Sequence, residues 1–181
     1  VVARIPGTAS TGTLILMAHY DSVQVSHGGN DDGAGVSTLL EIARALTTGP
    51  APANDVVLLF TDAEEACLCG AESFVAHDPL AAGRAVVLNV ESRGSTGPSV
   101  VFETSPGNAD LVSVYGSAVD RPVATSLAVE VYRDPAQQHR FHPVPGRRPV
   151  HRAQLGLHRR VGGVPRAAGH PRVDGPGEPA A

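Results

Sequence analysis

The stretch Thr13-Leu-Ile-Leu-Met-Ala-His-Tyr-Asp21, followed by Gly29-Asn-Asp-Asp-Gly-Ala-Gly35, decides the fold of this chain. Its first part is apolar at nearly every position, which is typical of a strand buried on both faces of a sheet. That strand delivers His19 and Asp21 to its carboxyl end, and the glycine-flanked turn places Asp31 at the start of a helix. Histidine and aspartate side chains gathered in this way are common ligands of zinc.

Strand-like and helix-like segments alternate along the rest of the chain. The run Val1–Ile5 is expected to form a hairpin with the deciding stretch, through a turn that contains Pro6 and Gly7. Helices are predicted over residues 34–46, 70–76 and 109–119, and further strands over residues 56–60, 85–90, 100–102 and 127–131. This alternation predicts an α/β fold, a three-layer α/β/α sandwich with a central sheet that is mixed but mostly parallel.

Carboxylates follow two of these strands directly. Glu64 and Glu65 come after the strand over residues 56–60, and Glu91 ends the strand over residues 85–90. Taken singly, such residues are more often caps, turn residues or solvent-exposed charges. In open α/β sheets, however, ligands collect beyond the carboxyl ends of the strands, where residues far apart in sequence meet. We therefore expect these glutamates to converge with His19.

Length and composition indicate one domain with a core, because the chain has 181 residues of which 42% are hydrophobic. No apolar run reaches the length of a membrane span, and Val1 does not head a signal peptide. We expect the N-terminal part of the protein, with any targeting segment, to lie outside this sequence. Cys67 and Cys69 are too few and too close for a disulfide framework, so we expect them to pack as small hydrophobic residues.

Four phrases of the sequence together resemble the di-zinc aminopeptidase family. They are His19-Tyr-Asp-Ser-Val23, Gly29-Asn-Asp-Asp-Gly-Ala-Gly35, Thr61-Asp-Ala-Glu-Glu65 and Leu88-Asn-Val-Glu-Ser-Arg-Gly94. The family includes bacterial leucyl-type aminopeptidases, glutamate carboxypeptidase II and the endoplasmic-reticulum and vacuolar membrane metallopeptidases, and the last phrase is most similar to the last group. The resemblance covers residues 1 to about 134 and implies a zinc-exopeptidase-like fold.

The resemblance implies a set of metal ligands for two zinc ions. Asp31 would bridge the two ions, and His19 and Glu91 would complete the protein ligands of one of them. Glu65 would bind the other ion. The family pattern also requires a histidine near the C-terminus, in a Tyr-His context, as a further ligand of the second ion.

The resemblance also implies roles for residues around the ions. Glu64 would be the general base that takes a proton from the attacking water. Asp21 would accept a hydrogen bond from the second ring nitrogen of His19 and so fix its tautomer. Arg93 would contact substrate, although a structural salt bridge is an equal alternative. Asp32 is expected to be a residue of the helix start rather than a ligand.

The family pattern ends near Asp134, and residues 135–181 differ from the rest of the chain. This segment is rich in Pro, Gly and Arg, with eight arginines against Asp174 and Glu178. We interpret it as a basic tail that is disordered or out of frame. A reading frame shifted by one base permits the family's expected phrases in order, including an apolar strand and Tyr-His. Residues 1–134 would then be a partial catalytic domain, and the second zinc site of this chain would be incomplete. The alternative is that a histidine of the tail supplies the missing ligand: His139, His142, His151, His158 or His170.

These features predict a metal-dependent exopeptidase that removes N-terminal residues from peptide substrates through a water activated by two zinc ions. A related di-zinc carboxypeptidase or deacylase stays an alternative, although such enzymes usually carry Asp-x-Lys-Gly where this chain has Asp31-Asp-Gly-Ala-Gly35. A non-catalytic relative with an incomplete metal site is a second alternative, and this chain is expected to have little activity. A nucleic-acid partner is not expected. The protein is expected to be secreted or attached to a membrane outside the cytoplasm.

Overall fold

The computed structural model describes residues 1–92, 96–105, 107–124, 126–127 and 151–156. The strands are β1 (Val2–Ile5), β2 (Thr13–His19), β3 (Asp55–Thr61), β4 (Ala85–Glu91), β5 (Val100–Thr104), β6 (Val123–Ala124) and β7 (His151–Gly156). The helices are α1 (Gly33–Thr48), α2 (Glu64–Cys67), α3 (Cys69–His77) and α4 (Ala109–Ala118), with a 3-10 helix η1 at Pro79–Ala81. In these ranges no helix is both long and apolar enough to cross a membrane.

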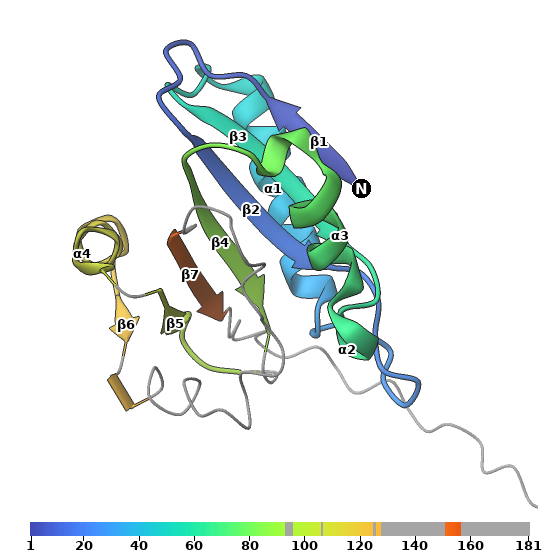
Figure 1. Ribbon diagram of the computed structural model, residues 1–181. Helices are drawn as coiled ribbons and strands as arrows, with labels where there is room; N and C mark the ends of the chain where they lie inside the picture. Colours follow the sequence, from blue (N-terminus) through green and yellow to red (C-terminus); the bar gives the residue numbers. More distant parts are fainter. Residues whose placement is uncertain (93–95, 106, 125, 128–150, 157–181) are drawn as a thin grey trace, which may run out of the picture.

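A single mixed sheet runs through the described part of the molecule, with the strand order β1-β3-β2-β4-β7-β5-β6 (Figure 1). Its centre is parallel, since β2 pairs in parallel with β3 on one side and with β4 on the other. His19 lies opposite Thr61 in this register, and Met17 lies opposite Asn89. Continuing the second pairing by two residues places Glu91 beside His19, so the register itself brings two predicted ligands to one edge.

The expected hairpin between β1 and β2 is wrong, because β1 pairs antiparallel with β3 instead. β2 is buried along most of its length and takes a position with a partner on each side. β1 is mostly exposed, and an exposed strand is better placed at the edge of a sheet than beside its centre. The sheet therefore ends at β1, with β3 between it and β2.

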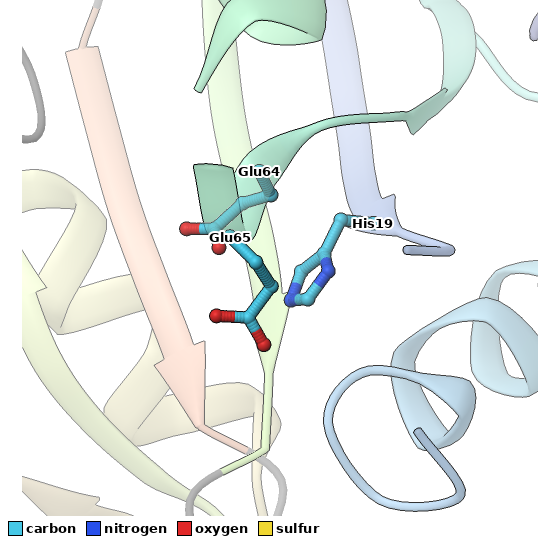
Figure 2. A group of neighbouring side chains, drawn as sticks. All are labelled: His19, Glu64 and Glu65. Atoms are coloured by element: carbon cyan, nitrogen blue, oxygen red, sulfur yellow. The ribbon is translucent and has the colours of Figure 1, made fainter. Parts of the chain in front are cut away.

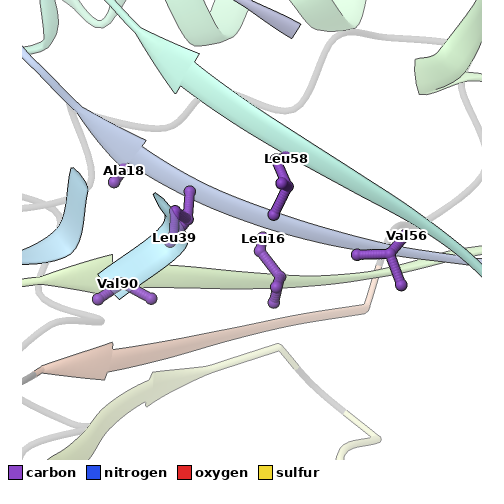
Figure 3. Close-up of a cluster of buried hydrophobic side chains, with 6 residues drawn as sticks. All are labelled: Leu16, Ala18, Leu39, Val56, Leu58 and Val90. Carbon is purple, nitrogen blue, oxygen red and sulfur yellow. The ribbon is translucent and has the colours of Figure 1, made fainter. Parts of the chain in front are cut away.

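Helices cover both faces of the central strands, which confirms the predicted α/β sandwich. On one face Leu39 of α1 packs against Leu16 and Val90, within the cluster of buried side chains drawn in Figure 3. On the opposite face Phe74 of α3 packs against a second cluster that includes Val57. Leu39 and Val57 are both 0% exposed, so each face of the sheet has a fully buried residue at its centre.

Strand β7 lies in the segment that the sequence predicts to be a disordered or out-of-frame tail. It pairs in parallel with β4 and antiparallel with β5. A strand with two neighbours is held by backbone hydrogen bonds along both edges, and these do not require hydrophobic periodicity in its own sequence. Only residues 151–156 of that tail are described, and the domain boundary near residue 134 stays a prediction. Of the strand predicted over residues 127–131, only Leu127 is described.

Cys67 and Cys69 form a disulfide bond with each other, so the expectation that they pack as small hydrophobic residues is wrong. Both cysteines are exposed. The cause is the tight turn between α2 and α3, at which Leu68 has a left-handed backbone with φ of 57°. This turn directs Leu68 into the protein, where it is buried, and leaves the cysteines on either side of it at the surface.

Candidate metal centre

His19 is the residue around which the candidate site is built. It ends β2 at the carboxyl edge of the sheet, and it is only 3% exposed. Its Nε2 atom lies 3.1 Å from Oδ1 of Asp31 and 3.6 Å from Oε1 of Glu91. Glu91 ends β4, and Asp31 lies in the turn before α1. The structure thus brings together three residues that the sequence predicts as ligands of one metal ion.

Glu64 and Glu65 reach the same place from α2. Ala63 has a left-handed backbone with φ of 55°, which turns the chain sharply from the end of β3 into this helix. Figure 2 shows the two glutamate side chains next to the imidazole of His19, with their carboxylates directed differently. Potential ligand atoms of the three residues all lie within 4.8 Å of one another. The two neighbouring carboxylates therefore reach the site in different directions, and the separate functions expected of them stay a prediction.

The carboxylate of Asp21 holds the start of α2. Its Oδ1 accepts the backbone N–H of Glu64 at 3.0 Å, and its Oδ2 accepts that of Glu65 at 3.1 Å. Nδ1 of His19 lies 3.4 Å from Oδ1 of Asp21 and 3.1 Å from the backbone carbonyl oxygen of the same residue. A carbonyl can only accept, so this contact assigns the proton of a neutral His19 to Nδ1 and turns the lone pair of Nε2 toward the carboxylates.

Asp32 is the N-cap of α1, as the sequence predicts, and it also reaches the site. It is 1% exposed, and its carboxylate accepts the backbone N–H of Gly35 at 3.0 Å and that of His19 at 3.2 Å. It therefore ties the start of α1 to the end of β2. A carboxylate oxygen of Asp32 also lies within 4.8 Å of ligand atoms of His19 and Glu91. Sequence reasoning omitted Asp32 from the metal site, although the doubled aspartate was the available signal.

Burial and mutual repulsion act on these carboxylates. Burial and the negative charge of Glu91 raise the pKa of Asp31 to about 6 and that of Asp32 to about 7. For His19, burial lowers the pKa, but the hydrogen bond with Glu91 and the surrounding negative charges outweigh it and raise the pKa to about 10. A positive charge among these carboxylates, whether a proton or a metal ion, reduces their mutual repulsion.

The donor set fits a divalent metal ion. An imidazole nitrogen and several carboxylate oxygens converge at one edge of the sheet, and zinc, manganese and cobalt all accept such ligands. A divalent cation would offset the repulsion that raises the pKa of Asp31 and Asp32, and it would replace the proton on Nε2 of His19. Arg93, the predicted substrate contact, lies outside the described residues.

Comparisons with known proteins find a family model and curated relatives that match most of the chain. A family model described as Peptidase family M28 matches residues 1–140. Endoplasmic reticulum metallopeptidase 1 of Mus musculus is 34% identical over 134 residues, which are 74% of this chain and 15% of that protein. The vacuolar membrane protease of Yarrowia lipolytica is 37% identical over 122 residues, which are 67% of this chain and 12% of that protein. The chain thus spans only a small part of these curated relatives.

Solved structures of low sequence identity share the fold. The LapA aminopeptidase of Legionella pneumophila superposes with a TM-score of 0.63 at 20% identity, covering 86% of this chain and 43% of that one. A zinc aminopeptidase from Bacillus subtilis gives a TM-score of 0.58 at 21% identity, with 85% of this chain and 38% of that one covered. These likenesses support the α/β architecture described above.

Proposed function

Because the chain belongs to peptidase family M28, we propose that it carries part of a zinc-dependent peptidase site that removes residues from the N-terminus of peptides. The observation that supports this most directly is the convergence of His19 with carboxylates from three different segments of the chain. The finer assignment to an N-terminal exopeptidase rests on the four motifs that resemble the di-zinc aminopeptidases.

The proposed ligands come from separate elements. His19 and Glu91 would hold one zinc ion from the ends of β2 and β4, Glu65 would hold a second from α2, and Asp31 would lie between them. When bound, the ions would lower the pKa of a water molecule from about 15.7 toward roughly 7 and polarise the scissile carbonyl. Asp21 orients the ring of His19 through Nδ1, so that Nε2 faces the metal position.

Glu64 is proposed as the general base. It lies next to a proposed ligand, Glu65, and its carboxylate is directed differently (Figure 2), while its potential ligand atoms stay within 4.8 Å of those of His19 and Glu65. In this role it takes the proton of the attacking water and passes it to the amine that leaves. Asp21 fixes the backbone at Glu64 and Glu65, and so sets the directions from which both carboxylates act.

We propose that the second zinc position is incomplete in this chain. The family's C-terminal histidine ligand has no counterpart in a Tyr-His phrase of the sequence. Within the described residues, the two clusters of potential ligands contain His19 as their one histidine. The position shared by Glu65 and Asp31 would therefore bind zinc more weakly than the position at His19.

We further propose that the protein acts outside the cytosol, attached to a membrane. The relatives that share most of this chain are named for the endoplasmic reticulum and for the vacuolar membrane. The Cys67–Cys69 disulfide supports the same proposal, because disulfides persist mainly in oxidising compartments.

Three variants of the zinc-loaded chain test the division of roles. Glu64→Gln should keep its zinc content but lower kcat by about 10²–10⁴-fold, the usual size of a general-base contribution. Glu65→Gln should lose the zinc of the second position as well as activity. Glu72→Gln, an exposed residue on α3, is the matched control and should change neither. Zinc is measured by elemental analysis and activity with aminoacyl p-nitroanilides.

Two results would contradict the proposal. Equal hydrolysis of free and N-acetylated peptides would show that a free N-terminus is not required, which excludes an N-terminal exopeptidase. A chain that binds zinc tightly at His19 but hydrolyses no peptide, even with excess metal, would favour the non-catalytic relative.

A further inference from the structure

The Cys67–Cys69 disulfide joins the two ends of the turn between α2 and α3. α2 is a single helical turn, so it has Glu64 and Glu65 at its start and Cys67 at its end. α3 begins at Cys69. Leu68 lies between the cysteines and is both the C-cap of α2 and the N-cap of α3. The disulfide thus closes a small covalent ring around Leu68, directly after the two site glutamates.

Leu68 connects this ring to the candidate site by packing. Its side chain is 7% exposed and lines a cavity of about 10 Å³ together with His19 and Glu64. A cavity of this size holds no more than about one water molecule. Because the packing is this close, a shift of Leu68 must be taken up by the side chains around it.

The α3 side of the turn is anchored close to the disulfide, whereas the α2 side is anchored by Asp21 only at the start of the helix. On the α3 side, the N–H of Gly70 donates to the carbonyl of Asp62, and a Cβ at Gly70 would lie 2.5 Å from that oxygen. On the α2 side, a four-residue helix gains little from its own hydrogen bonds. Leu68 also has a left-handed backbone that a residue with a Cβ rarely adopts. A covalent link from α2 to the anchored α3 therefore constrains a turn that is otherwise poorly stabilised.

The disulfide is also accessible to chemistry. Both cysteines are exposed, and they are the only 2 cysteines of the sequence, so a reductant has one target. One thiolate of a dithiol attacks a sulfur, breaks the S–S bond and forms a mixed disulfide, and its second thiol then displaces the protein sulfur. The dithiol is oxidised to a disulfide. Cys67 and Cys69 gain two electrons and two protons and become free thiols.

We propose that this disulfide is a positioning pair for the metal centre, and that a dithiol reductant weakens metal binding by opening it. The inference rests on the proposed metal site and adds redox control to it. With the ring open, α2 is held mainly by Asp21 at its start, and the carboxylates of Glu64 and Glu65 no longer keep fixed directions.

Cobalt(II) is the probe for the test, because its visible absorption reports the geometry of its ligands. Three samples are titrated with Co²⁺. The first is the oxidised chain, and the second is the chain reduced by a dithiol, from which the reductant is then removed without oxygen. The third is the second sample after reoxidation. The double variant Cys67→Ser/Cys69→Ser is titrated with and without prior reduction. Alkylation and mass measurement establish the state of the cysteines, and hydrogen exchange reports the backbone of residues 64–69.

The reduced chain and the double variant should bind Co²⁺ about 10–100-fold more weakly, the effect typical of groups that orient metal ligands. Their visible spectra should differ from that of the oxidised chain, and α2 amides should exchange faster. Reoxidation should restore the affinity, and the dithiol treatment should leave the double variant unchanged. Reversal in one and the same chain distinguishes positioning from a folding defect of the variant.

Equal affinities and spectra in the oxidised chain, the reduced chain and the double variant would overturn this inference alone. Tighter binding by the reduced chain but not by the double variant would also overturn it, because the thiolates would then be acting as ligands. An oxidised chain that is alkylated without reduction has no disulfide, which would overturn it as well. Absence of Co²⁺ binding in every form would overturn the proposed metal site and this inference with it.

Discussion

Oδ1 of Asp21 accepts the backbone N–H of Glu64 at 3.0 Å, across 43 positions of the sequence. The same carboxylate accepts the N–H of Glu65 and lies 3.4 Å from Nδ1 of His19. One side chain at the end of β2 therefore orients an imidazole on its own segment and the start of a helix that follows β3. The geometry of the candidate site depends on it twice.

Removal of this carboxylate should weaken metal binding. We expect Asp21→Ala to lower zinc affinity by about 10–100-fold, because it frees the ring of His19 and removes the cap of α2 together. Competition with a chromophoric chelator measures the affinity. Asp110→Ala, an exposed aspartate in the first turn of α4, is the matched control. Equal affinities in the two variants would mean that Asp21 orients neither group.

Zinc stoichiometry should reveal the incomplete second position. We expect the chain to hold one zinc ion tightly and fewer than two in all, because the sequence has no Tyr-His phrase of the kind proposed to complete the second position. Dialysis against a weak chelator followed by elemental analysis measures this. Two equivalents that survive dialysis would show that another residue supplies the missing ligand.

The convergence of the proposed ligands could be predicted from the sequence because it follows from one rule. His19 and Glu91 each end an apolar run, and in a parallel sheet such ends meet at one edge. The pairing partner of β1 could not be predicted in the same way. Val2–Ile5 could pair with β2 or with β3, since both are apolar. Which of them it pairs with depends on which one has a free edge once the rest of the sheet has formed.

Details that depend on local backbone geometry also could not be predicted from the sequence. The cap that Asp21 places on α2 requires the left-handed turn at Ala63, which no residue type there indicates. The disulfide requires the turn at Leu68, which sets Cys67 and Cys69 side by side at the surface. Neither turn uses glycine, the residue whose presence would have signalled a positive φ.

Two glycine substitutions should change stability in opposite directions. A Cβ at Gly70 would lie 2.5 Å from the carbonyl oxygen of Asp62, so Gly70→Ala should force α3 away from the end of β3 and lower the melting temperature. A Cβ at Gly116, inside α4, meets nothing within 4 Å. Gly116→Ala should therefore stabilise the chain by about 0.5–1 kcal/mol, the usual gain in a helix. Chemical denaturation followed by circular dichroism measures both.

Neighbouring leucines on α1 should differ sharply in their contributions. Leu39 is 0% exposed in the cluster with Leu16 and Val90, whereas Leu40 is 57% exposed. Leu39→Ala should cost about 2–5 kcal/mol of unfolding free energy, because it leaves a cavity between α1 and the sheet. Leu40→Ala should stay within about 0.5 kcal/mol, as surface substitutions usually do. Similar losses in both variants would contradict the packing of α1 on this face.

Asp55 should make part of the stability depend on acidic pH. The N–H of Gly7 donates to its Oδ1 at 2.8 Å, and Arg4 lies 2.9 Å from its Oδ2, so β1 is tied to the start of β3. The hydrogen bond from Gly7 lowers the pKa of Asp55, desolvation opposes it, and Arg4 and Ser10 add further lowering effects, each smaller than that of desolvation. A carboxyl with a lowered pKa in the folded state stabilises the fold above its unfolded pKa. That stabilisation is lost as pH falls through the folded pKa.

The fall in melting temperature from pH 7 to pH 3 should therefore be smaller in Asp55→Asn than in the unchanged chain, with Asp110→Asn as the control. An equal fall in all three would show that the contacts of Asp55 carry no pH-dependent stability.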